Sequence, residues 1–192
     1  MENTFWEKFL QDYNDAQMLV IGVGRQLHKS QFESEAAMSE IMDFYSKFLD
    51  KKNYFIITSH KEGGFKDSGF NLKRVCNPLD SSEEQGQWEL YNKWLSATLN
   101  KKLMIVELGE DFNNPNVFRW PFEKIVFINQ KSKMYRVSDK FYQLPENIGE
   151  RAVGVPENAI RFLIELREYL QKILLLNNVF YGIVLLNYSI RL

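Results

Sequence analysis

Short, unbroken runs of apolar residues alternate along the chain with longer stretches in which apolar residues recur every three or four positions. The unbroken runs lie at residues 18–21, 54–57 and 103–106, the second of them within a strand predicted at 53–58, and their length and β-branched content are typical of strands buried on both faces. The periodic stretches lie at residues 4–13, 34–49 and 87–99 and predict amphipathic helices. Strand and helix therefore alternate, as in a doubly wound parallel sheet.

The second half of the chain continues this alternation less regularly. Apolar or alternating runs at residues 125–128, 133–138 and 152–155 predict three further strands, and residues 156–170 predict a closing helix with Pro156 at its start. We expect an α/β fold, with a mostly parallel, Rossmann-like sheet that carries helices on both faces. The length predicts one domain over residues 1–192.

Composition and charge exclude several classes of protein. Lys and Arg number 24 against 25 for Asp and Glu, so no excess of positive charge favours nucleic-acid binding. Cys76 is the only cysteine, and His28 and His60 are the only histidines, so we expect neither an internal disulfide nor a zinc site. The N-terminus lacks the layout of a signal peptide, which favours a cytoplasmic location.

The last 22 residues, 171–192, form an apolar tail. Asn177 and Asn178 interrupt it, and the uninterrupted part is too short to span a membrane. We expect the tail to pack against the domain or to form a homo-oligomer, with no membrane contact.

Candidate binding residues follow three of the predicted strands. The first strand runs into Gly22-Val23-Gly24-Arg25, the second into Ser59, His60 and Glu62, and the third into a loop that spans residues 109–115. Loops at the carboxyl ends of parallel strands converge on the ligand crevice, and a Gly-x-Gly turn lets backbone N–H groups approach a phosphate. The sequence therefore predicts a nucleotide site at one edge of the sheet.

The most specific motif is the loop after the third strand. It reads Glu107-Leu108-Gly109-Glu110-Asp111-Phe112-Asn113-Asn114-Pro115 and is followed by Trp120-Pro121-Phe122. This motif resembles the Glu-Leu-Gly-x-Gly-x-Asn-Thr-Pro loop and Tyr-Pro-Phe segment of the sirtuins, in their macrodomain-associated microbial branch. Residues 53–65, the Gly22-Val23-Gly24 turn and residues 154–170 are similar to other segments of that family, in the same order.

The resemblance implies an NAD-binding fold, with NAD or ADP-ribose as the ligand. Gly22, Val23, Gly24 and Arg25 would face the diphosphate, where Arg25 could supply a charge-assisted contact. Ser59 and His60 would lie near the ribose. The third loop would line the adenosine side through Gly109, Asn113 and Asn114, with Glu110 between them.

The sequence also departs from the family pattern. Arg25-Gln26-Leu27-His28 replaces Ala-Gly-x-Ser, and His60 and Glu62 replace the Asn and Asp that follow the second strand. Residues 71–87 form a shortened loop in place of the catalytic-histidine loop and the four-cysteine zinc module. A base to activate the ribose hydroxyl therefore has no counterpart.

Three functions follow as hypotheses. The first is a degenerate, zinc-free sirtuin-like domain, a pseudoenzyme that binds NAD or ADP-ribose without ordinary deacylase activity. The second is a divergent ADP-ribosyltransferase or NAD glycohydrolase that uses His60 and Glu62 as an acid/base pair. The third is a non-catalytic interaction module in which Glu110 and Asp111 repel a phosphate and block the crevice.

Overall fold

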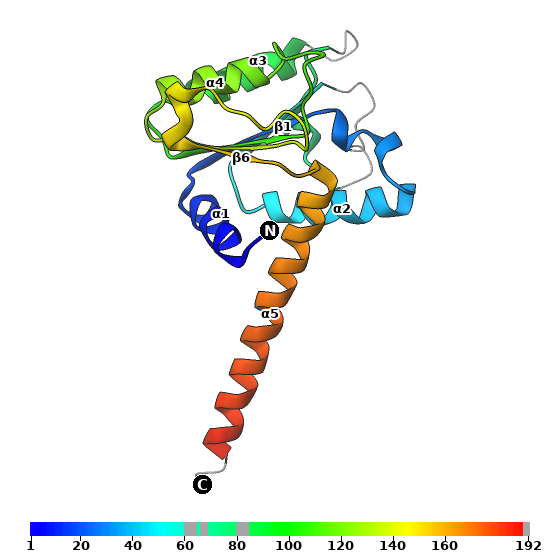
Figure 1. The fold of residues 1–192 in the computed structure, drawn as a ribbon, viewed down its shortest axis with the longest axis vertical. Coiled ribbons are helices and arrows are strands. Elements are labelled where there is room, and N and C mark those ends of the chain that lie inside the picture. The colour runs from blue at the N-terminus through cyan, green and yellow to red at the C-terminus, as the bar shows by residue number, and fades with distance from the viewer. Residues whose placement is uncertain (60–64, 66–68, 80–84, 190–192) are drawn as a thin grey trace.

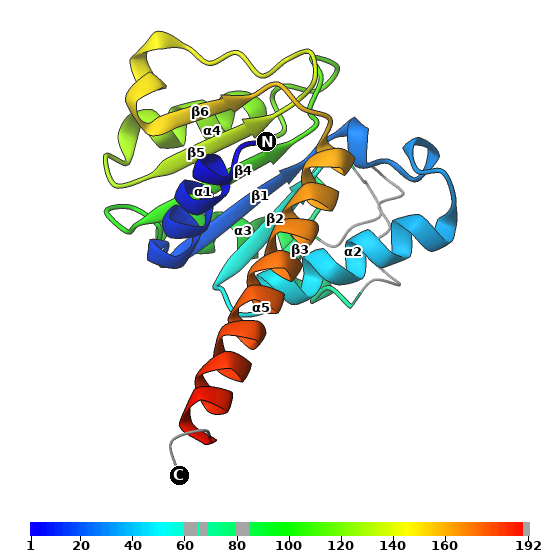
Figure 2. The same ribbon diagram turned by 60° about the horizontal axis from the view of Figure 1, so that its bottom comes forward.

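A single parallel sheet of six strands forms the centre of the computed structural model, which describes residues 1–59, 65, 69–79 and 85–189. Of Gln85 and of residues 177–189 only the backbone is described. The strand order is β3-β2-β1-β4-β5-β6, and every neighbouring pair is parallel. Figure 2 shows this order across the sheet. The strands are β1 (Met18–Val23), β2 (Tyr54–Thr58), β3 (Val75–Cys76), β4 (Leu103–Leu108), β5 (Lys133–Val137) and β6 (Ala152–Val155).

Helices cover both faces of this sheet (Figure 1). One face packs against α1 (Asn3–Asp15), α2 (Glu35–Leu49) and α5 (Ala159–Ser189), and the other packs against α3 (Gln85–Ser96) and α4 (Arg119–Ile128). All residues of β1, β2 and β4 are buried, as expected for central strands of a sheet covered on both sides. The predicted Rossmann-like, doubly wound fold is confirmed.

The strand order reverses direction between β1 and β4. Chain connections lead from β1 outward to β2 and β3, then return to β4 on the other side of β1 and continue to β5 and β6. In open α/β sheets, ligands bind outside the carboxyl ends of the strands at this switch point. The fold therefore places the crevice between the exits of β1 and β4.

The strand predicted at residues 125–128 is wrong. These residues form the last part of α4, in which Val126 is fully buried while Phe127 and Ile128 are each 54% exposed. A short apolar run cannot by itself be told from the end of a helix. Here Phe122 and Val126, four residues apart, form the buried face of α4 and settle the choice.

The segment 71–87 contains secondary structure that its loop-like composition does not predict. Residues Leu72–Arg74 form a 3-10 turn, and Val75 and Cys76 then pair with Ile56 and Ile57 as the two-residue edge strand β3. Two residues are too few to produce a recognisable alternation of apolar and polar positions.

The closing helix is much longer than its predicted end at Leu170. α5 continues through the two asparagines to Ser189, and it extends away from the rest of the molecule (Figures 1 and 2). Within the residues that the structure describes, no helix is long and apolar enough to cross a membrane.

Candidate functional site

The exits of β1, β2 and β4 lie side by side at the carboxyl edge of the sheet. Val23 is paired with Thr58 of β2 on one side and with Leu108 of β4 on the other. Beyond these pairs, the Ser59 N–H donates to the Val23 carbonyl at 3.2 Å, and the Gly24 N–H donates to the Leu108 carbonyl at 2.8 Å. The structure thus brings together the three turns that carry the predicted site residues. His60 and Glu62 lie outside the described residues.

Gly24 and Gly109 allow the first and third turns to touch. A Cβ atom on Gly24 would lie 2.4 Å from the Glu110 Cα atom, closer than any real contact. Gly109 has a φ of 67°, in the left-handed region, and a Cβ atom there would lie 2.4 Å from the Gln26 Cβ atom. The Gln26 N–H donates to the Gly109 carbonyl at 3.2 Å. Close packing of two loops therefore accounts for both glycines.

Glu110 is a buried carboxyl group at the centre of this edge. Its exposed fraction is 2%, and its Oε2 atom accepts a hydrogen bond from the Ser59 hydroxyl at 3.1 Å. Burial, the largest cause, together with the negative charges of Asp111 and Glu107 raises the pKa of Glu110 to about 8, against the opposing effects of the Ser59 hydrogen bond and the positive charge of Arg119. Glu110 is therefore mostly neutral at pH 7 and can donate as well as accept a hydrogen bond.

A polar hollow of about 240 Å³ lies beside Glu110 at the same edge. Its lining combines charges of both signs with amide groups and comes from the exits of β1, β4 and β5 and the residue before α5; the residues include Arg25, Gln26, Glu110, Asp111, Asp139 and Lys140. Arg25 is exposed, so its guanidinium can reach a ligand. Asn113 and Asn114 are also exposed, and Asn113 donates from both its backbone and its side chain to the Asp111 carboxylate.

The N-terminus of α5 borders this hollow, but the protein itself satisfies its N–H groups. Gln26 Oε1 accepts from the Ala159 N–H at 2.9 Å, and Asn158 Oδ1 accepts from the Ile160 N–H at 2.9 Å and the Arg161 N–H at 3.4 Å. The Phe162 N–H donates to the Asn158 carbonyl at 2.9 Å. An anion in the hollow would therefore be held by side chains such as Arg25, not by the free N–H groups of a helix.

A buried network of ion pairs lies behind the loop after β5, whose Phe141 lines the hollow. The sequence analysis did not predict this network. Glu107 Oε1 lies 2.9 Å from Arg119 Nη1 and 2.8 Å from Arg136 Nε, and Arg136 Nη1 lies 2.8 Å from Glu123 Oε1. Glu107 and Arg136 have fully buried side chains in the adjacent strands β4 and β5. The signal in the sequence was a charged residue directly after the apolar run at 103–106 and another inside the alternating stretch at 133–138.

This network also fixes the loop that follows β5. Arg119 Nη2 donates to the Phe141 carbonyl at 2.9 Å, and Arg136 Nη1 donates to the Gln143 carbonyl at 2.9 Å. The ring of Phe112 lies 4.4 Å from the Arg119 guanidinium and contacts the Phe141 ring edge-on, with 5.2 Å between the ring centroids. Phe112 therefore packs on the loop after β5, and it is not among the side chains that line the hollow.

These features define the class of site: a polar crevice at the switch point of a Rossmann-like parallel sheet. No family model matches the chain. The chain is 24% identical over 86 residues to a protein ADP-ribosyltransferase from Staphylococcus aureus strain Mu50. The aligned part makes up 45% of this chain and 27% of that enzyme, so the chain spans about a quarter of the length of this curated relative.

Proposed function

We propose that the chain binds NAD, ADP-ribose or a nucleotide of that type in the polar hollow between the exits of β1 and β4. The observation that carries this proposal is the hollow itself, which lies at the switch point and is lined by Arg25, Glu110 and Lys140. The similarity to a protein ADP-ribosyltransferase supports an ADP-ribose-related ligand, and so does the resemblance of the third loop to the sirtuins.

Two of the lining groups, Arg25 and Glu110, have a chemical task in this proposal. Arg25 pairs with a phosphate through charge-assisted hydrogen bonds. Glu110, neutral at pH 7, offers a donor and an acceptor to the hydroxyl groups of a ribose. Ser59 is not among the residues that line the hollow, and it positions the Glu110 carboxyl group through their hydrogen bond. A volume of about 240 Å³ accommodates part of a dinucleotide, such as one ribose with its phosphate, and leaves the remainder at the open edge.

We further propose that the domain lacks ordinary deacylase activity. The chain has no histidine between Phe70 and Trp88, where the resemblance would place the catalytic base. It has one cysteine in that segment in place of four. The domain is thus a degenerate, zinc-free sirtuin-like protein that keeps the nucleotide site.

Calorimetric titration with ADP-ribose and with NAD at pH 7 tests the nucleotide site. We expect binding that weakens tenfold or more in Arg25→Ala, because a charge-assisted hydrogen bond contributes about 1.5–3 kcal/mol. Lys102→Ala, at the opposite edge of the sheet before β4, serves as the control and leaves the affinity unchanged. Absence of heat up to millimolar ligand would refute the nucleotide site and favour the blocked-crevice alternative.

The named activity of the relative favours a second candidate, a divergent ADP-ribosyltransferase or NAD glycohydrolase. In this reading His60 and Glu62 supply the acid and the base. The measurement is release of nicotinamide from NAD, followed by chromatography. Turnover that is unchanged in both His60→Ala and Glu62→Ala would exclude these two residues from the chemistry.

A further inference from the structure

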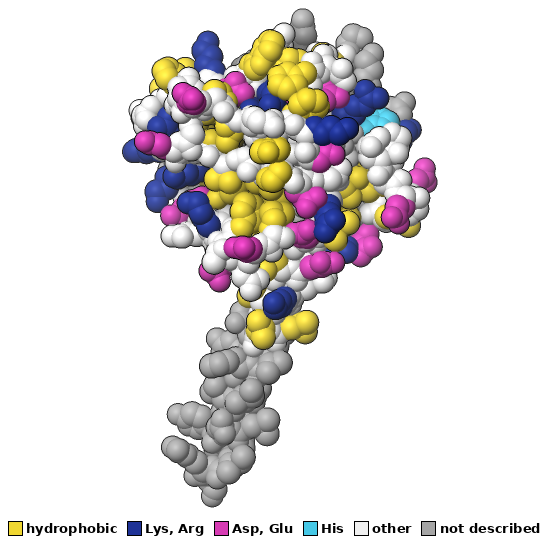
Figure 3. Space-filling view, in the orientation of Figure 1, with side chains coloured by type: hydrophobic (Ala, Val, Ile, Leu, Met, Phe, Trp, Pro, Cys, Tyr) yellow, Lys and Arg dark blue, Asp and Glu magenta, His cyan; other side chains and the backbone are white. Residues whose placement is uncertain are grey.

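The second half of α5 exposes large apolar side chains. Near its start, α5 packs on the sheet through Phe162, Leu163 and Leu166, each no more than 1% exposed. Further along, Leu174, Leu175 and Leu176 are 62%, 66% and 60% exposed. Figure 3 shows apolar side chains at the point where the helix leaves the body of the molecule. A 31-residue helix is about 46 Å long, so much of its length lies beyond the sheet.

The sequence of this part of the helix is uncharged and mostly apolar, with Asn177, Asn178 and Asn187 among its polar residues. From Ile173 to Ile190 the chain contains no Asp, Glu, Lys or Arg. Leu174, Leu175 and Leu176 follow one another at about 100° intervals around the helix, and apolar side chains over so wide an arc are normally buried against another surface. The segment therefore requires an apolar partner surface.

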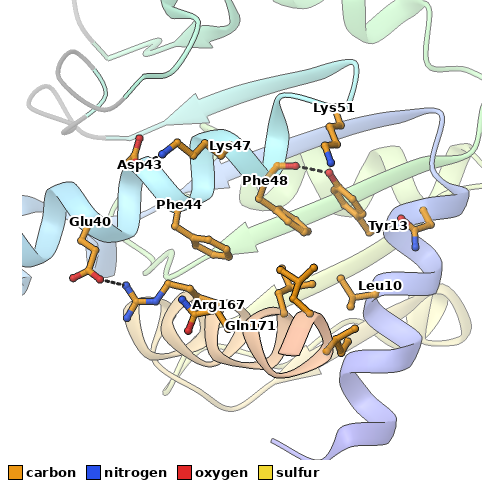
Figure 4. A pocket seen from close by; sticks show the side chains of 14 residues that line it. Leu10, Tyr13, Glu40, Asp43, Phe44, Lys47, Phe48, Lys51, Arg167 and Gln171 are labelled. Atoms are coloured by element: carbon orange, nitrogen blue, oxygen red, sulfur yellow. Dashed lines mark hydrogen bonds and ion pairs between the residues drawn. The ribbon is translucent and has the colours of Figure 1, made fainter. Parts of the chain in front are cut away.

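A groove of about 640 Å³ lies directly beside this segment, between α1, α2 and α5 (Figure 4). Its floor consists of Leu10 and Tyr13 from α1 and Phe44 and Phe48 from α2. The wall formed by α5 consists of Leu170, Ile173 and Leu174. The groove and the exposed leucines are therefore parts of one continuous apolar surface.

The charged residues on the rim of the groove are largely paired with one another. Arg167 Nη1 lies 2.7 Å from Glu40 Oε1, and Lys47 Nζ lies 2.7 Å from Asp43 Oδ2, as Figure 4 shows. The Tyr13 hydroxyl donates to the Phe48 carbonyl. The rim thus presents little net charge to an occupant, and the uncharged segment that begins at Ile173 complements it better than a charged peptide would.

We propose that the chain forms a two-fold symmetric homodimer in which the apolar half of α5 from each copy covers the groove of the other copy. α5 supplies both a wall of the groove and the exposed segment. A single two-fold axis close to Leu174 therefore places the exposed segment of each copy over the groove of the other copy. The two α5 helices then run antiparallel, with their axes about 8–10 Å apart.

Sedimentation velocity of the full chain between about 1 and 100 μM tests the dimer. We expect a species of twice the chain mass of 22.8 kDa. Leu175→Glu should shift the protein to monomer and raise the dimer dissociation constant at least tenfold, because the substitution buries an unpaired charge in the interface. Leu99→Glu is the matched control, since Leu99 is 55% exposed but lies outside the groove, and it should remain dimeric. Circular dichroism confirms that both variants are folded.

Cross-linking between two differently tagged single-cysteine variants tests the groove itself. Leu175→Cys mixed with Lys47→Cys should form a mixed disulfide, whereas Leu175→Cys mixed with Leu99→Cys should not. The native Cys76 is buried and does not compete. A wild-type monomer at 100 μM would overturn the proposal, as would equal cross-linking in both mixtures. A monomer that binds phosphatidylcholine vesicles would overturn it in favour of a lipid partner.

Discussion

The Ser59 hydroxyl donates a hydrogen bond to Oε2 of Glu110 over 3.1 Å, and this bond joins the exit of β2 to the exit of β4 across the end of β1. Because Glu110 is buried there with its pKa raised to about 8, it changes charge within an accessible range of pH. Two predictions follow from this carboxyl group, one for ligand binding and one for stability.

Nucleotide binding should weaken as the pH rises through about 8. Below this pH Glu110 is neutral and can donate to a ribose hydroxyl, whereas above it the carboxylate repels a nearby phosphate. The affinity for ADP-ribose, measured by calorimetry from pH 6 to pH 9.5, should fall by about tenfold or more. In Glu110→Gln this fall should disappear, since glutamine does not titrate. A fall that persists unchanged in the variant would assign the titration to another group.

The stability of the folded chain should also respond to Glu110. Its folded pKa of about 8 lies above the unfolded value of about 4.3, so the proton favours the folded state. This stabilisation is complete below pH 4.3 and is lost progressively as the pH rises to about 8. The Tm of the wild type should therefore fall relative to the Tm of Glu110→Gln from pH 5 to pH 8, and the difference should then level off. Glu89→Gln, on the exposed side of α3, should show a smaller change across the same range.

Gly24→Ala should destabilise the protein by about 1–3 kcal/mol, because overpacking forces the backbone apart. The new Cβ atom would lie 2.4 Å from the Glu110 Cα atom and could not fit unless the two loops separated. Urea unfolding gives the free energy of unfolding. Gly149→Ala is the matched control, since a Cβ atom there meets nothing within 4 Å, and its effect should stay within about 0.5 kcal/mol. Equal effects at the two positions would contradict the close packing of the loops.

Arg136→Met should cost about 3–5 kcal/mol of folding stability, because it leaves the fully buried Glu107 with Arg119 as its remaining partner. The loop after β5 should loosen as well, since Arg136 also holds the Gln143 carbonyl. Urea unfolding measures the loss. Arg161→Met, whose side chain is 70% exposed and pairs within α5, should cost about 0.5 kcal/mol or less. A similar cost for both variants would mean that the buried network adds little to stability.

The central part of the fold could be predicted from the order of residues. The apolar runs that became β1, β2 and β4 are buried on both faces, and such strands leave a continuous signal in the sequence. The edge of the sheet was harder. β3 has two residues, and the run at residues 125–128 is the end of a helix whose outer side chains remain in solvent. A run of apolar residues in the sequence does not show which side chains will pack against another element of the fold.

The candidate site was predictable only in outline. Strand exits and glycines identified the carboxyl edge, but not the reason for each glycine, which is the approach of Glu110 to Gly24 and of Gln26 to Gly109. These contacts join residues more than 80 positions apart in the chain, so no local pattern encodes them. The same holds for Gln26, which links the Gly109 loop to the N-terminus of α5.

The alternation of apolar runs with helical periodicity is a local property, and it was enough to establish the α/β class, the buried central strands and the edge where their loops end. The burial of Glu110, the ion pairs around Glu107 and the groove beside α5 depend on the tertiary structure. Desolvation and charge pairing act through space, so the chemistry of a carboxyl group follows from the neighbours that folding brings to it.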